Sequence, residues 1–141
     1  MMTRLLMGRM WFVVLVWAAC GILAATSFAG KTEKQNNSRV SSVFQGAPAV
    51  ASGLQNPYAG RPTAVLAGRK LFVRHCAQCH GQNAEGRGST PPLSSSVVRE
   101  TPDGVLFWFL KNGNLRAGMP SWSGLPPQQR WQIVSFLKSL R

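Results

Sequence analysis

Apolar residues recur at helical spacing in three stretches of the second half of the chain. Intervals of three and four residues place each set on one helix face, which predicts helices over residues 63–75, 101–112 and 126–141. No stretch shows the alternation of a half-buried strand, so the sequence predicts an all-α fold. The three apolar faces consist of Val65, Gly68, Phe72 and Cys76; of Val105, Leu106, Phe109 and Leu110; and of Trp131, Ile133, Val134, Phe136, Leu137 and Leu140.

Polar residues and prolines mark the ends of these helices. Thr63 is predicted to cap the first helix. Thr101 is predicted to cap the second, with Pro102 at the first helical position, where its missing N–H removes no hydrogen bond. Gly113 follows the second helix and permits the backbone to leave it, and Pro126 opens the third.

Residues 1–30 have the composition of an export segment. Arg4 and Arg9 precede a densely apolar run without charge, which is the usual order of a basic region and a hydrophobic region. We expect cleavage after Ala29, retention as a membrane anchor, or lipid attachment at Cys20. Each alternative predicts a protein in the periplasm or at the outer face of the cytoplasmic membrane, either soluble after cleavage or tethered at its N-terminus.

Residues 31–63 are rich in Ser, Asn, Gln, Gly, Ala and Pro and show no periodicity. This composition predicts a flexible linker, in which Val43, Phe44 and Tyr58 are exposed or docked singly and do not form a core. Residues 64–141 are then the one folded domain. A domain of this size has a marginal core and usually requires a cofactor, a metal or disulfides, and three cysteines are too few for a disulfide scaffold.

The strongest chemical signal is the segment Cys76-Ala77-Gln78-Cys79-His80. This is the C-x-x-C-H attachment sequence of c-type haem. Two thiols three residues apart on one helical turn can reach both vinyl groups on one edge of a porphyrin and form thioethers. His80 is then carried under the iron, where its imidazole is an axial ligand. The pattern predicts one covalently attached haem c per chain.

Two other chemistries are open to a cysteine pair, a dithiol redox site and a zinc site. A thioredoxin-like C-x-x-C opens a helix after a strand, whereas Cys76 here closes a predicted helix and no strand precedes it. Zinc requires a fourth ligand, and the only other histidine is His75, directly beside Cys76. Both alternatives fit the sequence less well than haem does.

With these residues in view, the chain resembles a class I c-type cytochrome over most of residues 64–141. Gly68 and Phe136 resemble the glycine and the aromatic residue at which the first and last helices of that family cross. Pro91-Pro92-Leu93, after a glycine-rich loop, is similar to the segment whose proline carbonyl holds the axial histidine, which implies that role for Pro92. The resemblance implies a small three-to-four-helix cytochrome c-like fold around one covalent haem.

Gly118-Met119-Pro120 resembles the methionine-ligand loop of the same family. This implies Met119 as the second axial ligand, so that His80 and Met119 are the expected metal ligands and Cys76 and Cys79 the attachment residues. The alternative is that Met119 fills a gap in the core, as most methionines do. Met119, however, follows no helical stripe, and thioether sulfur suits an iron that changes charge without changing ligands.

The resemblance implies an electron carrier between redox partner proteins, either alone or as a subunit of a dehydrogenase or oxidase, without catalytic residues. Residues 64–141 contain 10 Lys and Arg against 3 Asp and Glu, a formal charge of +7, which favours acidic partners or an anionic membrane. The alternative is a solvated charged surface without a specific partner. Nucleic acid is excluded as a partner, because the cations are dispersed and no reader motif is present. The alternative is a haem enzyme or small-ligand sensor with an open axial site, for which His75, beside the attachment motif, cannot easily supply an acid or base on the opposite face.

Overall fold

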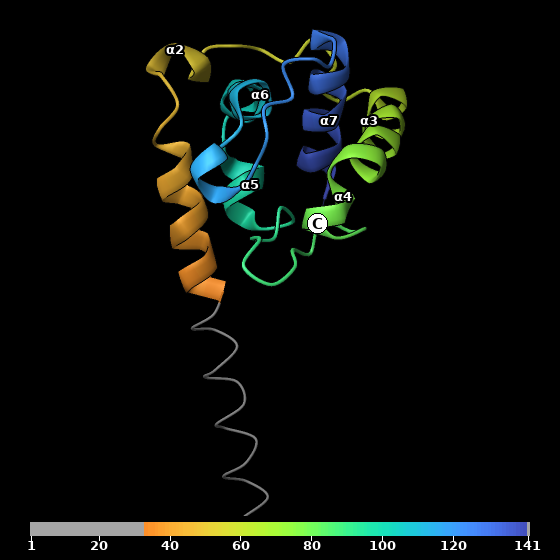
Figure 1. Cartoon of the computed structure of the whole chain (residues 1–141). Helices are drawn as coiled ribbons and strands as arrows, with labels where there is room; N and C mark the ends of the chain where they lie inside the picture. Colours follow the sequence, from red (N-terminus) through yellow and green to blue (C-terminus); the bar gives the residue numbers. More distant parts are fainter. Residues whose placement is uncertain (1–32, 141) are drawn as a thin grey trace, which may run out of the picture. The chain divides into compact units, whose positions relative to one another are not determined.

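The computed structural model describes residues 33–140. Within this range the regular structure is helical, with isolated β-bridges and no strand, so the predicted all-α fold is confirmed (Figure 1). Residues 33–44 form the first helical segment. The elements that follow are α2 (Ala49–Ser52), α3 (Pro62–His75), α4 (Ala77–His80), α5 (Ser96–Glu100), α6 (Asp103–Asn112), the 3-10 helix η1 (Leu115–Ala117) and α7 (Pro127–Ser139).

Helices α3 and α7 form the most extensive contact between elements of the described fold. Gly68 of α3 faces α7 so closely that a Cβ atom there would collide with the carbonyl of Gln132 and lie 3.0 Å from the Cβ of Phe136. The ring of Phe136 lies 5.1 Å from that of Phe72 at an angle of 50°. The predicted crossing at Gly68 and Phe136 is confirmed, and glycine is required there because the two backbones leave no room for a side chain.

We expect Gly68→Ala to lower the free energy of unfolding by about 1–3 kcal/mol, although alanine is the better helix former. The added methyl forces the Gln132 backbone away, and overpacking a closed interface costs this much. Gly124→Ala is the matched control, because a Cβ there meets nothing within 4 Å; its effect stays within about 0.5 kcal/mol. Denaturant unfolding of the haem-loaded protein measures both, and equal stability of the two variants would contradict the close crossing.

The main hydrophobic core lies between α3, α6 and α7 and contains much of the three predicted apolar faces, while Val105 and Phe109 of α6 form a second cluster with Ala51. The four predicted residues of α6 are all buried. In α7 the predicted face is buried except for Trp131 and Leu140, which are half-buried. The indole of Trp131 stacks on the ring of Phe107 with centroids 4.0 Å apart. Helical periodicity therefore identified most of the buried side chains of the three long helices.

The predicted N-caps of two helices are wrong. α3 begins at Pro62 and not after Thr63, and α6 begins at Asp103 and not after Thr101. Thr101 instead ends α5, where its Oγ1 donates a hydrogen bond of 2.7 Å to the carbonyl of Val97. A proline occupies the first helical position of α3 and the N-cap of α6. Because proline fixes φ near the helical value and has no N–H to satisfy, these helices begin without a side-chain cap.

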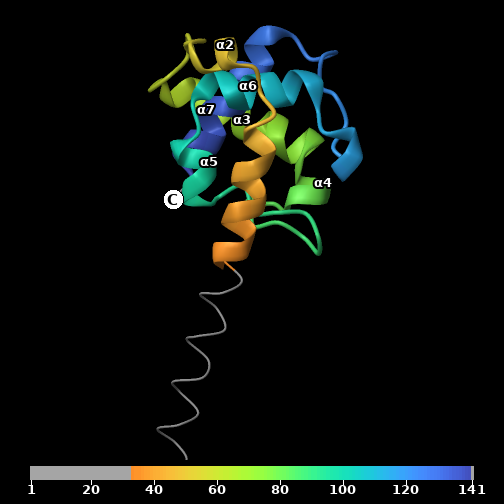
Figure 2. The same ribbon diagram turned by 90° about the vertical axis from the view of Figure 1, so that its left-hand side faces the viewer.

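The segment before α3 is more ordered than the sequence predicts. A linker without regular structure was expected over residues 31–63, yet residues 33–44 are helical and α2 follows them. Figures 1 and 2 show residues 36–44 of the first helical segment beside α5. Val40 and Ala51 are buried, with 4% and 1% of their surface exposed. The prediction of irregular structure is therefore corrected for the described part of this segment.

The order of this segment was not predicted because the side chains that it packs against come from distant parts of the sequence. Phe44 packs edge-on against Phe109 of α6 with ring centroids 5.3 Å apart, a contact between residues far apart in the sequence. Val43 is exposed, in agreement with its predicted role. Short helices with one buried residue each show too few apolar positions for a periodicity, so their order depends on tertiary contacts that no local pattern reveals.

The export segment predicted over residues 1–30, with its cleavage, anchor and lipid alternatives, lies outside the described residues. Among the helices of residues 33–140, none combines the length and the apolar character needed to cross a bilayer. The domain limits predicted at residues 31 and 64 stay predictions.

Candidate functional site

Cys76, Cys79 and His80 lie on one tight turn directly after α3. Cys76 joins α3 to α4, and its carbonyl oxygen accepts hydrogen bonds from the amides of Cys79 at 3.1 Å and His80 at 2.9 Å. Cys76 is half-buried, Cys79 is exposed, and neither forms a disulfide. The turn therefore presents two thiols and one imidazole from a hydrogen-bonded backbone, as the C-x-x-C-H spacing requires.

The ring of His80 is half-buried and oriented by the loop that follows it. Its Nδ1 lies 3.3 Å from the carbonyl oxygen of Pro91. A carbonyl oxygen only accepts, so in the neutral ring Nδ1 carries the proton and Nε2 keeps its lone pair. Burial lowers the pKa of His80, while the bond to Pro91 acts in the opposite sense, and the net effect favours the neutral ring. A neutral imidazole with a free Nε2 is the form that binds haem iron.

The carbonyl that faces His80 belongs to Pro91, so the role implied for Pro92 is corrected. The direction of the chain at this point is fixed by a hydrogen bond of 2.8 Å from the amide of Leu93 to the carbonyl of Ala84. Both prolines lack an N–H and differ only in where their carbonyls point. The sequence could not distinguish them, because that direction is set by the closure of the loop.

Met119 lies in a loop that closes on itself. The amide of Asn114 donates to the carbonyl of Met119 at 2.9 Å, and the amide of Met119 donates back at 3.0 Å. Gly113 and Gly118 adopt φ values of +72° and +79°, a region that suits glycine. Met119 is half-buried and packs against the same hydrophobic cluster as Cys76. The fold thus brings a thioether and the attachment turn to one apolar cluster.

Several large apolar side chains of this cluster are only half-buried, and an apolar face that covered them would add the stabilisation that full burial gives. A porphyrin has such a face. The chain offers two thiols, a neutral imidazole, a thioether and a partly covered apolar cluster that Cys76 and Met119 contact. These are the donors and surroundings that a c-type haem requires, so the residues present fit this group. The half-buried side chains include Leu93, Val97, Phe107, Trp122, Leu125 and Trp131.

The two other chemistries of a cysteine pair are not supported. Burial raises the pKa of the Cys76 thiol to about 12, and the neighbouring Cys79 adds to the shift. A dithiol redox site needs the opposite, a thiol whose pKa is lowered so that the thiolate forms readily. Residues 33–140 contain no group of three or more His, Cys, Asp or Glu side chains arranged to hold a metal ion such as zinc.

Sequence analysis did not single out Ala84. It is the one residue other than glycine with a positive φ in the described part of the chain, at +62°, and its side chain is fully buried. Its carbonyl accepts hydrogen bonds from both Leu93 and Ser94. No signal in the sequence could have found it, because a glycine is the residue normally expected in this conformation.

Comparison with known proteins agrees with this arrangement. The family model described as cytochrome c oxidase, cbb3-type, subunit III matches residues 63–137. The quinohemoprotein alcohol dehydrogenase ADH IIB of Pseudomonas putida is 32% identical over 97 residues, which cover 66% of this chain and 14% of that enzyme. The cbb3-type cytochrome c oxidase subunit FixP of Bradyrhizobium sp. (strain ORS 278) is 34% identical over 79 residues, 52% of this chain and 27% of that subunit.

The chain thus spans a small part of the length of these two relatives. The family match, in contrast, extends over more than half of the chain and includes the attachment turn Cys76–His80 and the Met119 loop. From this match and the donor set of the site we conclude that the chain belongs to the cbb3-type cytochrome c oxidase subunit III family and is a monohaem class I cytochrome with covalently bound haem c.

Proposed function

We propose that this cytochrome passes single electrons between redox partner proteins, with Cys76 and Cys79 attached to the haem by thioether bonds and His80 and Met119 as axial ligands. The observation that carries the proposal is the orientation of the His80 ring. Its Nδ1 is held at the Pro91 carbonyl, which leaves Nε2 as the metal-binding atom of a turn that also bears both thiols.

The bound haem supplies an iron that changes oxidation state by one electron. The role of the chain is to keep the ligands in place during that change. Pro91 keeps the proton on Nδ1 of His80 and so fixes the tautomer. The paired hydrogen bonds between Asn114 and Met119 hold the methionine loop closed. Ligands that are fixed in this way need little rearrangement when the charge of the iron changes.

We propose that the protein is an electron carrier in which no residue has a catalytic role. A haem enzyme or sensor would need an open axial position and an acid or base beside it. The other histidine of the chain is His75, and its ring packs against Trp122 with centroids 5.3 Å apart. In this arrangement His75 is a packing side chain next to the attachment turn, and Met119, as the second axial ligand, would fill the position that peroxide or a gas needs.

The partners that we propose are the protein components of an oxidase or dehydrogenase outside the cytoplasm. The two relatives are named as a quinohemoprotein alcohol dehydrogenase and a cbb3-type oxidase subunit, which supports both kinds of complex. The formal charge of +7 on residues 64–141 would steer the domain toward acidic surfaces. The export segment predicted over residues 1–30 supports a periplasmic or outer-face location, soluble or tethered.

The experiment uses the full chain purified with its haem. Reduced protein is mixed with an oxidised soluble c-type cytochrome, and the transfer is followed by absorbance, while hydrogen peroxide consumption is measured separately. We expect complete one-electron transfer, faster at low ionic strength with an acidic acceptor, and no peroxide turnover above that of free haem. Peroxide turnover without electron transfer would replace the carrier by the enzyme alternative.

A further inference from the structure

Ala84 is held in an unfavourable backbone conformation within the loop that orients His80. Alanine adopts its φ of +62° only at a steric cost, since the Cβ atom crowds the backbone in the left-handed region. The side chain is nevertheless fully buried. Strain of this kind persists only where the surrounding contacts hold the residue in place. The contacts around Ala84 must therefore be strong enough to hold this conformation.

The carbonyl of Ala84 links the two ends of the loop between Ala84 and Ser94 by hydrogen bonds. It accepts hydrogen bonds from the amides of Leu93 at 2.8 Å and Ser94 at 3.2 Å. Pro91 lies two residues before Leu93, so these bonds determine where its carbonyl stands relative to Nδ1 of His80. A displacement of Ala84 is thus transmitted along a short hydrogen-bonded path to the proposed axial ligand.

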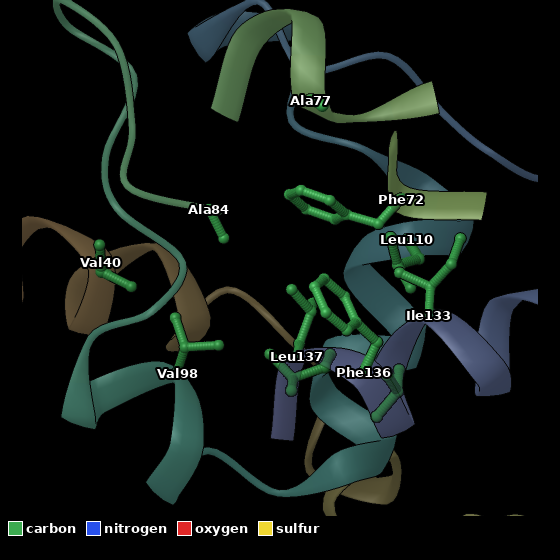
Figure 3. Close-up of a cluster of buried hydrophobic side chains, with 11 residues drawn as sticks. Val40, Phe72, Ala77, Ala84, Val98, Leu110, Ile133, Phe136 and Leu137 are labelled. Carbon is green, nitrogen blue, oxygen red and sulfur yellow. The ribbon is translucent and has the colours of Figure 1, made fainter. Parts of the chain in front are cut away.

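The methyl group of Ala84 belongs to a hydrophobic cluster that includes a residue from far upstream. Val40, from the helical segment before α2, is buried in this cluster together with Ala84 and with Val98 of α5. Figure 3 shows the three side chains on the same side of the cluster. Val40 lies before residues 63–137, the stretch that the family model matches.

We call residues 36–58 the N-terminal strap. Its middle part is fixed to α6 by close packing as well as by the edge-on contact of Phe44 with Phe109. The carbonyl of Ala51 lies against Gly104, where a Cβ atom would collide with it. Only glycine permits α2 to approach the first turn of α6 so closely.

The end of the strap is fixed by a buried amide. Nδ2 of Asn56 donates to Oδ2 of Asp103 and to Oγ of Ser135, both at 3.1 Å, and Oδ1 of Asn56 accepts from the amide of Tyr58 at 2.9 Å. All three bonds satisfy polar atoms that would otherwise be costly to bury. The strap is therefore attached at its start, middle and end.

We propose that the N-terminal strap is a working part of the haem domain, in which Val40 is a positioning residue for His80 that acts through Ala84 and the carbonyl of Pro91. The proposal rests on the proposed function, in which His80 is an axial ligand. The strap keeps Ala84 in its strained conformation, and the closed loop keeps the Nδ1 proton of His80 at its acceptor.

The test compares Val40→Ala with Val43→Ala in the haem-loaded full chain. Both remove the same atoms from one helical segment, but Val40 is 4% exposed and Val43 is 37% exposed. Proton NMR of the reduced protein, well below the unfolding transition, measures exchange of the His80 Nδ1 proton and of the Leu93 and Ser94 amides with solvent. We expect Val40→Ala to accelerate all three exchange rates by at least about tenfold and Val43→Ala to leave them unchanged.

Ala84→Gly tests whether the strap acts through the strain at Ala84. Glycine accepts the φ of +62° without strain, so the loop no longer needs the strap to hold this conformation. We therefore expect Ala84→Gly alone to keep the wild-type exchange rate at His80, and to cancel most of the acceleration caused by Val40→Ala when the two are combined. Unchanged exchange in Val40→Ala, or equal acceleration by Val40→Ala with and without Ala84→Gly, would overturn the positioning role and leave the carrier intact. A wild-type protein without a low-spin haem bound through His80 would instead overturn the proposed function, and this proposal with it.

Discussion

Replacing Cys76 and Cys79 together by alanine is expected to abolish covalent haem and to leave no stably folded protein. The core has few completely buried large side chains, namely Phe72, Ile133, Val98 and Val134. Many others, such as Trp122 and Leu93, are half-buried. A small domain of this kind gains too little from its own apolar contacts to offset the loss of chain entropy without the haem.

The double variant and the wild type are expressed with the same haem-attachment machinery and compared by intact mass, haem absorbance and circular dichroism. Cys20→Ala is the control, because Cys20 lies in the predicted export segment, and it is expected to keep a covalent haem. The single variants Cys76→Ala and Cys79→Ala are expected to retain one thioether and reduced stability. A haem-free double variant with the helical spectrum and cooperative unfolding of the wild type would contradict the dependence of folding on haem.

Most of the helical frame could be predicted from the sequence, because its contacts repeat with the helical period. The faces of α3, α6 and α7 each contain several apolar residues, and the structure buries most of them together. The crossing at Gly68 was implied by the resemblance to class I c-type cytochromes, and the structure shows its cause in the close approach of the Gln132 backbone. Long elements with repeated signals are the part of a fold that local pattern determines.

The short elements could not be predicted in the same way. α5 has five residues, and the two helical segments of the strap have one buried residue each, Val40 and Ala51. Their order depends on distant partners, for example Phe109 for Phe44 and Asp103 for Asn56. A sequence rich in Ser, Asn and Gly indicates flexibility only when no such partners exist.

The candidate site could be predicted where haem chemistry constrains the spacing of residues along the sequence. It could not be predicted where the direction of a backbone group in the folded loop decides which residue acts. The spacing of Cys76, Cys79 and His80 is set by the porphyrin that they must reach, so the motif can be recognised from the sequence alone. The choice of Pro91 over Pro92 depends on a carbonyl direction that the Leu93 to Ala84 hydrogen bond sets. The left-handed backbone of Ala84 has no sequence signal at all.

Met119→Ala is expected to keep the covalent haem, to lower the reduction potential and to let carbon monoxide bind the reduced iron. The thioether bonds at Cys76 and Cys79 do not involve Met119, so attachment persists. Thioether sulfur favours the reduced iron, and its loss is expected to lower the potential by on the order of 0.1 V, well inside the ~0.8 V that axial ligands span. If His80 and Met119 fill both axial positions as proposed, wild type is expected to bind carbon monoxide poorly.

Two further variants distinguish the loss of the Met119 sulfur from a disturbance of the loop that contains it. Leu115→Ala is the matched control, because Leu115 is 78% exposed at the start of the same loop, and both the potential and the carbon monoxide affinity should stay at wild-type values. Met119→His replaces one strong ligand by another, so it should lower the potential and still exclude carbon monoxide. Redox titration and carbon monoxide difference spectra measure these effects. If wild type already binds carbon monoxide and Met119→Ala alters neither property, the sixth position is open and the protein is a ligand-binding haem protein.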